Sequence, residues 1–510
     1  MSRQSHACGR ALAASLVFSF AFASPLSATW SICAVDTATG EIAIGSATCL
    51  ADFDLKANTP VLRVGKGVGV AQSFLGPIQL RQIIWDELGK GTDPAQILLL
   101  LEQADPDYET RQYGIVDLQG RAAAHTGNRA GPWAGHVTST VGTITYSIQG
   151  NVLTGPPVVL DAEDALLYTP GDLAEKLMAA MLAARAMGGD GRCSCTQAHP
   201  DACGSPPPIF THSAYVGYML LTRIGDVDGN NCDSSGCAKG IYYLDLNVPT
   251  GNPSLPDPVF RLLDMFDEWR FGLDGLPDHL QSSALFARPT LPADGTTLTE
   301  MTIELRDWEG DSLGHGGALV TVEHAPGSDG ISSIGGVIDN GDGTYTVPLT
   351  AGSIPGLDLF LVVAEVPEQR ATLYPYPALP SVWPLVAGAA YISSSNPTPL
   401  GLALTEPGPL EQSKYLVMLS ASGSSPGFDL GPVHVPLNYD AALLFSVVNA
   451  NRLPFVNTLG TFDTNGEQSA RFEPLPGWLD LLVGFQLTFA FITLEPIDAA
   501  SNPVAVFIIP

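Results

Sequence analysis

The sequence predicts an α+β domain followed by two all-β domains. First, the 510 residues are too many for one hydrophobic core. Second, helical and strand patterns alternate as far as Gly275, and helical periodicity disappears after it. Third, the 53 Gly and 41 Pro residues favour turn-rich β structure.

The composition excludes some function classes. The chain has 23 Lys and Arg against 52 Asp and Glu, a formal net charge of −29, so no nucleic-acid partner held by phosphate neutralisation is expected. Intrinsic disorder is excluded because 45% of the residues are hydrophobic and only 15% are charged.

Residues 1–28 have the pattern of a signal peptide. Arg3 and Arg10 precede an apolar run, residues 11–23, that is too short to span a membrane. Cleavage after Ala23 or after Ala28 fits the small-residue rule, and the second leaves Thr29 at the new N-terminus. We therefore expect a secreted, periplasmic or cell-surface protein with no transmembrane anchor after cleavage.

The first strands of the α+β domain (residues 29–275) form a predicted hairpin over residues 29–50, and a further strand pattern covers 61–74. The remaining predicted elements follow in order: helices at 78–88 and 94–103, strands at 112–117, 121–124 and 143–148, a helix at 172–187, strands at 214–223 and 241–248, and a helix at 258–270.

The rest of the chain consists of short alternating runs between turn residues. It predicts an immunoglobulin-like β-sandwich over 286–370, a Pro-rich linker over 371–387 and a C-terminal β-sandwich over 388–510. The run AALLFSVV, residues 441–448, is expected as one of the strands of the last module.

Seven cysteines remain after residue 28, and export favours disulfides among the last five. These five are Cys193, Cys195, Cys203, Cys232 and Cys237. An odd number leaves at least one thiol free or paired between chains. Weaker alternatives are zinc held by three of these cysteines with His199, and calcium held by the loop that begins at Asp226. Neither has the usual ligand spacing, so we expect no metal and no cofactor.

The residue that suggests chemistry is Thr29, a hydroxyl residue at a possible cleavage site. A threonine hydroxyl needs an adjacent base, and the α-amino group of an N-terminal threonine can supply one. Thr29 could equally be a residue that is simply tolerated after a cleavage site.

Several ordered blocks resemble one family. The chain has TWSICAVDTATGEIAIGSA at 29–47, GVGVAQSF at 67–74, RQYGIVDLQGRAAAHTG at 111–127, SIQGNVLTG at 147–155 and LAEKLMAAMLAARAMGGDGR at 173–192. Together these blocks, over about 29–270, resemble the domain-of-unknown-function family 1028, which is assigned to the Ntn (N-terminal nucleophile) hydrolase superfamily. The chain departs from the usual family pattern after Arg192, where it carries a Cys-rich insert.

The resemblance implies a four-layer αββα sandwich, Ntn-hydrolase-like, whose first strand presents Thr29 as the nucleophile for an amide substrate, a small molecule or a peptide-like compound. It also implies that Gln72 and Asn151 are candidate oxyanion donors, although either amide could instead satisfy backbone groups. Asp36 could orient the α-ammonium group or simply begin a turn.

The resemblance further places Arg111, Asp190 and Arg192 in family blocks. They could bind a substrate carboxylate, or form an Arg–Asp ion pair with a purely structural role.

Three functions therefore compete. The first is a secreted Ntn-type amidohydrolase with appended β modules. The second is a non-catalytic cell-surface or adhesion protein that uses the αββα scaffold for binding. The third is carbohydrate binding by the C-terminal sandwich, with Trp383 and Trp478 as the aromatic candidates for glycan attachment.

Overall fold

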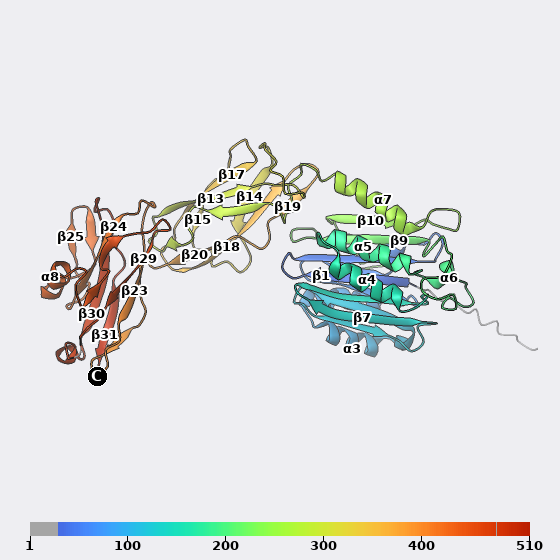
Figure 1. Cartoon of the computed structure of the whole chain (residues 1–510), viewed down its shortest axis with the longest axis horizontal. Coiled ribbons are helices and arrows are strands. Elements are labelled where there is room, and N and C mark those ends of the chain that lie inside the picture. The colour runs from blue at the N-terminus through green and yellow to red at the C-terminus, as the bar shows by residue number, and fades with distance from the viewer. Residues whose placement is uncertain (1–28, 476) are drawn as a thin grey trace, which may run out of the picture.

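The computed structural model describes residues 29–475 and 477–510, and the elements form three groups along one line (Figure 1). The predicted signal peptide and its cleavage sites lie outside the described residues. The N-terminal domain is mixed α/β, and the two groups that follow consist almost entirely of strands. We name these groups the middle module (residues 283–382) and the C-terminal module (residues 385–509).

Two antiparallel sheets form the N-terminal domain. The larger has the strand order β10 (Leu244–Val248), β9 (Val216–Thr222), β2 (Glu41–Thr48), β1 (Thr29–Asp36), β8 (Ile144–Asn151) and β7 (Ala134–Val141). The smaller has the order β3 (Pro60–Arg63), β4 (Gly67–Ser73), β5 (Arg111–Asp117) and β6 (Ala122–Thr126).

The sheets face each other, and helices cover their outer faces. Helices α4 (Pro157–Tyr168), α5 (Leu173–Ala186) and α7 (Pro258–Phe271) pack on the larger sheet, and α2 (Ile78–Lys90) and α3 (Pro94–Ala104) pack on the smaller. The short elements are α1 (Leu55–Asn58), η1 (Tyr108–Thr110) and α6 (Gly191–Ser194). The layers are thus helix, sheet, sheet and helix.

Strand β1 shows why the sequence folds this way. Successive side chains of a strand point to opposite faces. Trp30, Ile32 and Ala34 pack under the helices, whereas Cys33 and Val35 pack between the sheets. A strand covered on both faces needs apolar residues at successive positions, as this one has. Thr29 shares the inter-sheet face with Cys33, and this alternation directs its side chain between the two sheets.

The middle module packs two sheets around one apolar core. One contains β11 (Ser283–Phe286), β13 (Leu298–Glu304), β17 (Thr344–Thr350), β15 (Ser333–Ile334) and β16 (Ile338–Asp339). The other contains β12 (Leu291–Pro292), β20 (Ala378–Val382), β18 (Gly356–Glu365), β14 (Leu319–His324) and β19 (Arg370–Thr372).

The C-terminal module is a second pair of sheets with a separate core. One contains β21 (Leu385–Ala387), β23 (Leu400–Thr405), β29 (Glu467–Phe472) and β27 (Phe455–Val456). The other contains β22 (Tyr391–Ser393), β31 (Val504–Ile509), β30 (Gln486–Leu494), β24 (Lys414–Ser420) and β28 (Leu459–Thr461). A hairpin of β25 (Phe428–Leu430) and β26 (Val433–Val435), the helix α8 (Ala441–Val448) and the short helix η2 (Asp480–Leu482) complete it.

The structure differs from the sequence-based elements at three places. Residues 441–448, expected as a strand, form helix α8, because the Asp440 carboxylate caps the helix at the Leu443 N–H and a short, uniformly apolar run does not distinguish a strand from a helix. Strand β20 lies inside the expected linker 371–387 and pairs with β18. Helix α4 and strand β7 were not expected.

The described cysteines form three disulfides: Cys49–Cys193, Cys195–Cys203 and Cys232–Cys237. The expectation of disulfides is confirmed, although Cys49 also takes part. Cys33 is the free, buried thiol. The three cysteines considered as zinc ligands therefore form disulfides instead. Asp226, the first residue of the loop considered for calcium, accepts backbone N–H bonds from Arg223 and Tyr243. None of the helices within 29–475 and 477–510 is both long and apolar enough to cross a membrane.

Candidate functional site

Thr29 lies at the start of β1, directly opposite Asn151 on β8. The residue is buried, with 2% of its surface exposed. Its backbone nitrogen donates to Asn151 Oδ1 at 3.1 Å, and its carbonyl oxygen accepts from Gln72 Nε2 at 3.1 Å. The structure thus brings three predicted site residues together, two of them as holders of the Thr29 backbone.

Gln72 and Asn151 are already bonded to the protein. Gln72 Nε2 also donates to Gln112 Oε1 at 2.8 Å, so both of its hydrogens are used, and Gln72 Oε1 accepts from the Ser31 hydroxyl. Asn151 Nδ2 donates to Ser73 Oγ at 3.3 Å and to a backbone carbonyl. In this arrangement the two amides position the first strand, and a role as oxyanion donor would require them to exchange a partner.

The two predicted ion-pairing groups lie near this end of β1. Arg111 is opposite Ser73 and donates from Nε to Asp105 Oδ2 at 2.8 Å. Asp190 is completely buried and accepts from Arg192 Nη2 at 2.7 Å and from the Cys49 N–H at 2.7 Å. Both arginines bind carboxylates of the protein itself, which is the structural alternative from the sequence.

Arg111 and Gln72 also line a cavity of about 10 Å³, which has room for about one water molecule. A substrate would have to open this site further.

Asp36 does not belong to this site. It ends β1, roughly 23 Å along the strand from Thr29, because a strand rises about 3.3 Å per residue. Its Oδ1 accepts the N–H of Ala38 at 2.9 Å, which is the turn role considered from the sequence. Of the two roles considered for Asp36, this arrangement supports the turn, since the length of the strand separates its carboxylate from the Thr29 amine.

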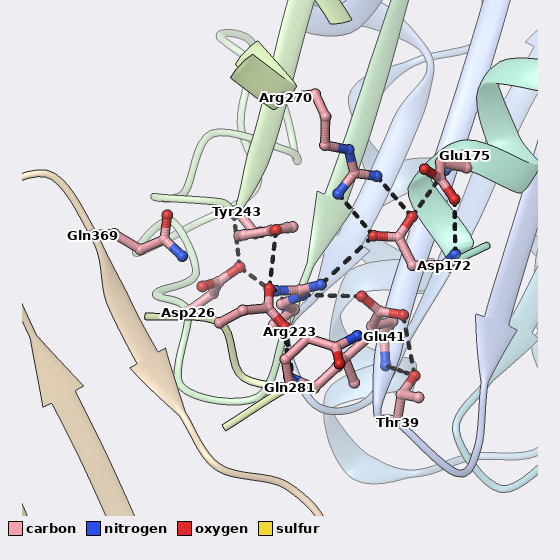
Figure 2. Close-up of polar contacts among 12 residues, drawn as sticks. Thr39, Glu41, Asp172, Glu175, Arg223, Asp226, Tyr243, Arg270, Gln281 and Gln369 are labelled. Carbon is pink, nitrogen blue, oxygen red and sulfur yellow. Dashed lines mark hydrogen bonds and ion pairs between the residues drawn. The ribbon is translucent and has the colours of Figure 1, made fainter. Parts of the chain in front are cut away.

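A second polar cluster, which the sequence did not reveal, surrounds Arg223 at the opposite end of the domain (Figure 2). The guanidinium binds Glu41 Oε1 at 2.9 Å and Asp278 Oδ2 at 2.5 Å, and Asp172 lies 3.9 Å away. Tyr243 stacks on it, with 3.5 Å between the guanidinium carbon and the ring centroid. Asp278 immediately precedes the middle module, so this cluster joins two parts of the chain.

Burial and charge act against each other in this cluster. Burial disfavours the charge of Arg223, yet Tyr243, Glu41 and Asp278 hold its pKa above the ordinary value. Burial raises the pKa of Glu41 although Arg223 opposes this. The Arg223 cluster is therefore a buried ion-pair network in which loss of one partner is strongly destabilising, because it leaves a buried charge uncompensated.

A cavity of about 350 Å³ lies beside the Arg223 cluster. Its lining contains five acidic side chains and two basic ones, together with Trp308 of the middle module. The five acidic residues are Asp36, Glu41, Asp172, Glu175 and Asp278. Residues from distant parts of the sequence line this cavity, so no local sequence motif predicts it.

Two family models match the chain. Residues 29–198 match the family of unknown function DUF1028. The predicted resemblance is confirmed. Residues 278–369 match domain 3 of invasin, which covers most of the middle module. No protein with a curated description matches this chain.

Solved structures with similar parts include a DUF1028-family protein of Silicibacter pomeroyi. It is 19% identical, with coverage of 48% of this chain and 89% of the other, at a TM-score of 0.35. The Escherichia coli adhesin FdeC is 11% identical, with coverage of 78% and 92% and a TM-score of 0.20. Invasin, a bacterial integrin-binding protein, is 12% identical at a TM-score of 0.18, and this chain spans 46% of that structure.

Proposed function

We propose that this protein acts at the cell surface as a non-catalytic adhesion protein, in which both the DUF1028-like domain and the two β modules serve as binding modules. The observation that carries this proposal is the match of residues 278–369 to an invasin domain. The three disulfides support it, because such bonds persist in oxidising, extracytoplasmic compartments.

The contacts between neighbouring parts of the chain support the same proposal. We name the contact between the N-terminal domain and the middle module the first joint, and the contact between the middle and C-terminal modules the second joint. Arg223 binds Asp278 across the first joint, and Gln369 Nε2 of the middle module donates to the Pro277 carbonyl at 2.8 Å. At the second joint, the buried Arg288 donates to the carbonyls of Glu406 at 2.7 Å and Gly408 at 3.0 Å. Buried joints of this kind hold the modules in fixed positions, which suits an extended surface protein whose modules present binding surfaces.

The test is adhesion of the whole exported chain. Beads coated with it should adhere to monolayers of cultured epithelial cells at least about tenfold more than beads coated with albumin. The heat-unfolded chain is the control, because adhesion by a folded surface should be lost on unfolding. Adhesion no greater than that of albumin-coated beads would overturn the proposal.

Amide hydrolysis by Thr29 is the second candidate, favoured by one observation. The Thr29 nitrogen is held 3.1 Å from Asn151 Oδ1, at the strand end where a free amine would need an acceptor. This reading requires that cleavage after residue 28 exposes the amine.

Periodate tests that requirement directly, since it converts an N-terminal threonine to an aldehyde that an aminooxy probe captures. The hydrolase candidate expects capture by the exported wild type, none by Thr29→Ala, and acylation of the wild-type residue by a β-lactone probe. An exported chain that starts elsewhere refutes it, and the adhesion proposal is unaffected.

A further inference from the structure

Helix α8 lies on the outside of the C-terminal module, far from the N-terminal domain (Figure 1). Seven of its eight residues are apolar, but only Leu443 and Ser446 are buried. A helix that is apolar on all sides is normally buried on all sides. One face of α8 packs on β24, and Phe445 also contacts Phe455 of β27, with 5.8 Å between the ring centroids, while Leu444, Val447 and Val448 remain exposed.

The helix and the segment that follows it carry five exposed apolar side chains, here named the α8 patch. The patch consists of the exposed side chains of Leu444 (47%), Phe445 (45%), Val447 (38%), Val448 (73%) and Leu453 (56%). Apolar side chains gathered in this way on a surface mark an interaction site, whereas single exposed ones are ordinary.

The helix that carries this patch is firmly fixed. Asp440 accepts the N–H of Leu443 at 2.8 Å, and its other oxygen accepts from Ser420, Ala421 and Ser422. The Leu419 N–H of β24 donates to Ser446 Oγ at 3.0 Å. The exposed side chains therefore sit on a scaffold ordered before binding, which reduces the entropy lost on association.

Charge selects the kind of partner. Two copies of a chain with net charge −29 repel each other, so a second copy is disfavoured. Residues 388–510 contain ten acidic residues and three basic ones, so an anionic lipid surface is disfavoured as well. A partner surface that is apolar at its centre and basic around it is complementary to the patch and to the net acidic module that carries it, in which Arg452 is the exposed basic residue next to Leu453.

We propose that the α8 patch is the surface through which this protein holds a protein partner, whose own surface carries an apolar depression rimmed by Lys and Arg. This inference rests on the proposed adhesive function and specifies where adhesion takes place.

The experiment compares coated beads of the full chain on epithelial monolayers. Val448→Asp places a charge at the most exposed side chain of the patch and should reduce adhesion at least about tenfold. Leu481→Asp is the matched control, because Leu481 is 91% exposed in the same module but lies outside the patch, and its adhesion should equal that of the wild type. Thermal unfolding and circular dichroism confirm that each variant is folded.

Two further arms identify the partner. Trypsin treatment of the monolayer should abolish adhesion, because the partner is a protein. Raising the salt from about 0.15 M to about 0.5 M should weaken adhesion, because it screens the basic rim. Adhesion that survives either treatment, or wild-type binding to phosphatidylcholine vesicles that is lost in Val448→Asp, overturns the inference.

The outcomes separate the two proposals. If the wild type adheres and Val448→Asp adheres equally, the α8 patch is not the contact and the adhesive function stands. If both Val448→Asp and Leu481→Asp lose adhesion, the effect is not specific to the patch, and the inference fails. If the wild type does not adhere, both the adhesive function and the inference fall.

Discussion

At the residue scale, the polar groups of the N-terminal domain are mostly bound to one another. Gln72 and Asn151 hold the first strand, and Arg192 holds Asp190. A residue type that signals chemistry in a sequence can equally serve as internal scaffolding, because buried polar groups must find partners. The sequence identified these residues as important, and their neighbours decide in which role.

His279, next to Asp278 at the first joint, should make stability depend on pH. Burial, and then the charge of Arg223, lower the pKa of His279 to about 3, against an ordinary value of 6.5. Between these values the unfolded chain binds a proton that the folded chain does not, so stability falls as the pH falls through this range. We expect the urea midpoint of wild type to fall between pH 6.5 and pH 4 by more than that of His279→Gln.

The comparison with the variant matters because Glu41 acts in the opposite direction. The raised pKa of Glu41 means that the folded chain binds a proton more readily than the unfolded chain does, so this group favours the folded state as the pH falls. The exposed His434 supplies the control, and His434→Gln should keep the wild-type dependence. Identical curves for wild type and His279→Gln would show that His279 is accessible to protons in the folded protein.

At the element scale, helix α8 depends on its N-cap residue, Asp440. The Asp440 carboxylate accepts N–H and O–H bonds at the helix start and from β24, and although burial opposes it, these bonds lower its pKa to about 2. Asp440→Ala should destabilise the C-terminal module by about 1–2 kcal/mol, as loss of a helix cap does. Urea unfolding with Asp429→Ala as the exposed control measures this, and equal losses in the two variants would refute the capping role.

The disulfides link elements over very different lengths of chain. Cys49–Cys193 closes 144 residues, whereas Cys195–Cys203 closes 8. By the chain-entropy argument, replacing the first pair by serine should cost about 5 kcal/mol and the second about 2.5 kcal/mol. Urea midpoints of the two double variants test this order, and a larger loss for the short loop would contradict it.

At the scale of the whole molecule, buried arginines join neighbouring parts of the chain. Arg223 connects the N-terminal domain to the middle module, and Arg288 connects the middle module to the C-terminal one. Because the Arg223 and Arg288 side chains are each buried between neighbouring parts of the chain, movement at a joint would expose the guanidinium group to solvent or separate it from its partners. The parts should therefore move little relative to one another.

Asp278→Asn should weaken the first joint. It removes one carboxylate from the buried Arg223 while Glu41 remains, so we expect a loss of about 2–3 kcal/mol and two separate calorimetric transitions, whereas we expect coupled unfolding of the two parts in the wild type. The exposed Glu309→Gln of the middle module is the control, with no expected change. A single transition at the wild-type temperature in Asp278→Asn would show that the ion pair does not couple the two parts.

Local patterns in the sequence were sufficient to predict the mixed α/β domain, the strand-rich remainder, the resemblance to DUF1028 and the presence of disulfides, because periodicity, caps and cysteine content act over a few residues. The tertiary structure alone decided that Gln72 and Asn151 meet at the Thr29 backbone and that helix α8 packs on β24. It also decided that Glu41, Arg223 and Asp278 meet in a joint. These facts depend on pairings between residues distant in the chain, and such pairings leave no local pattern.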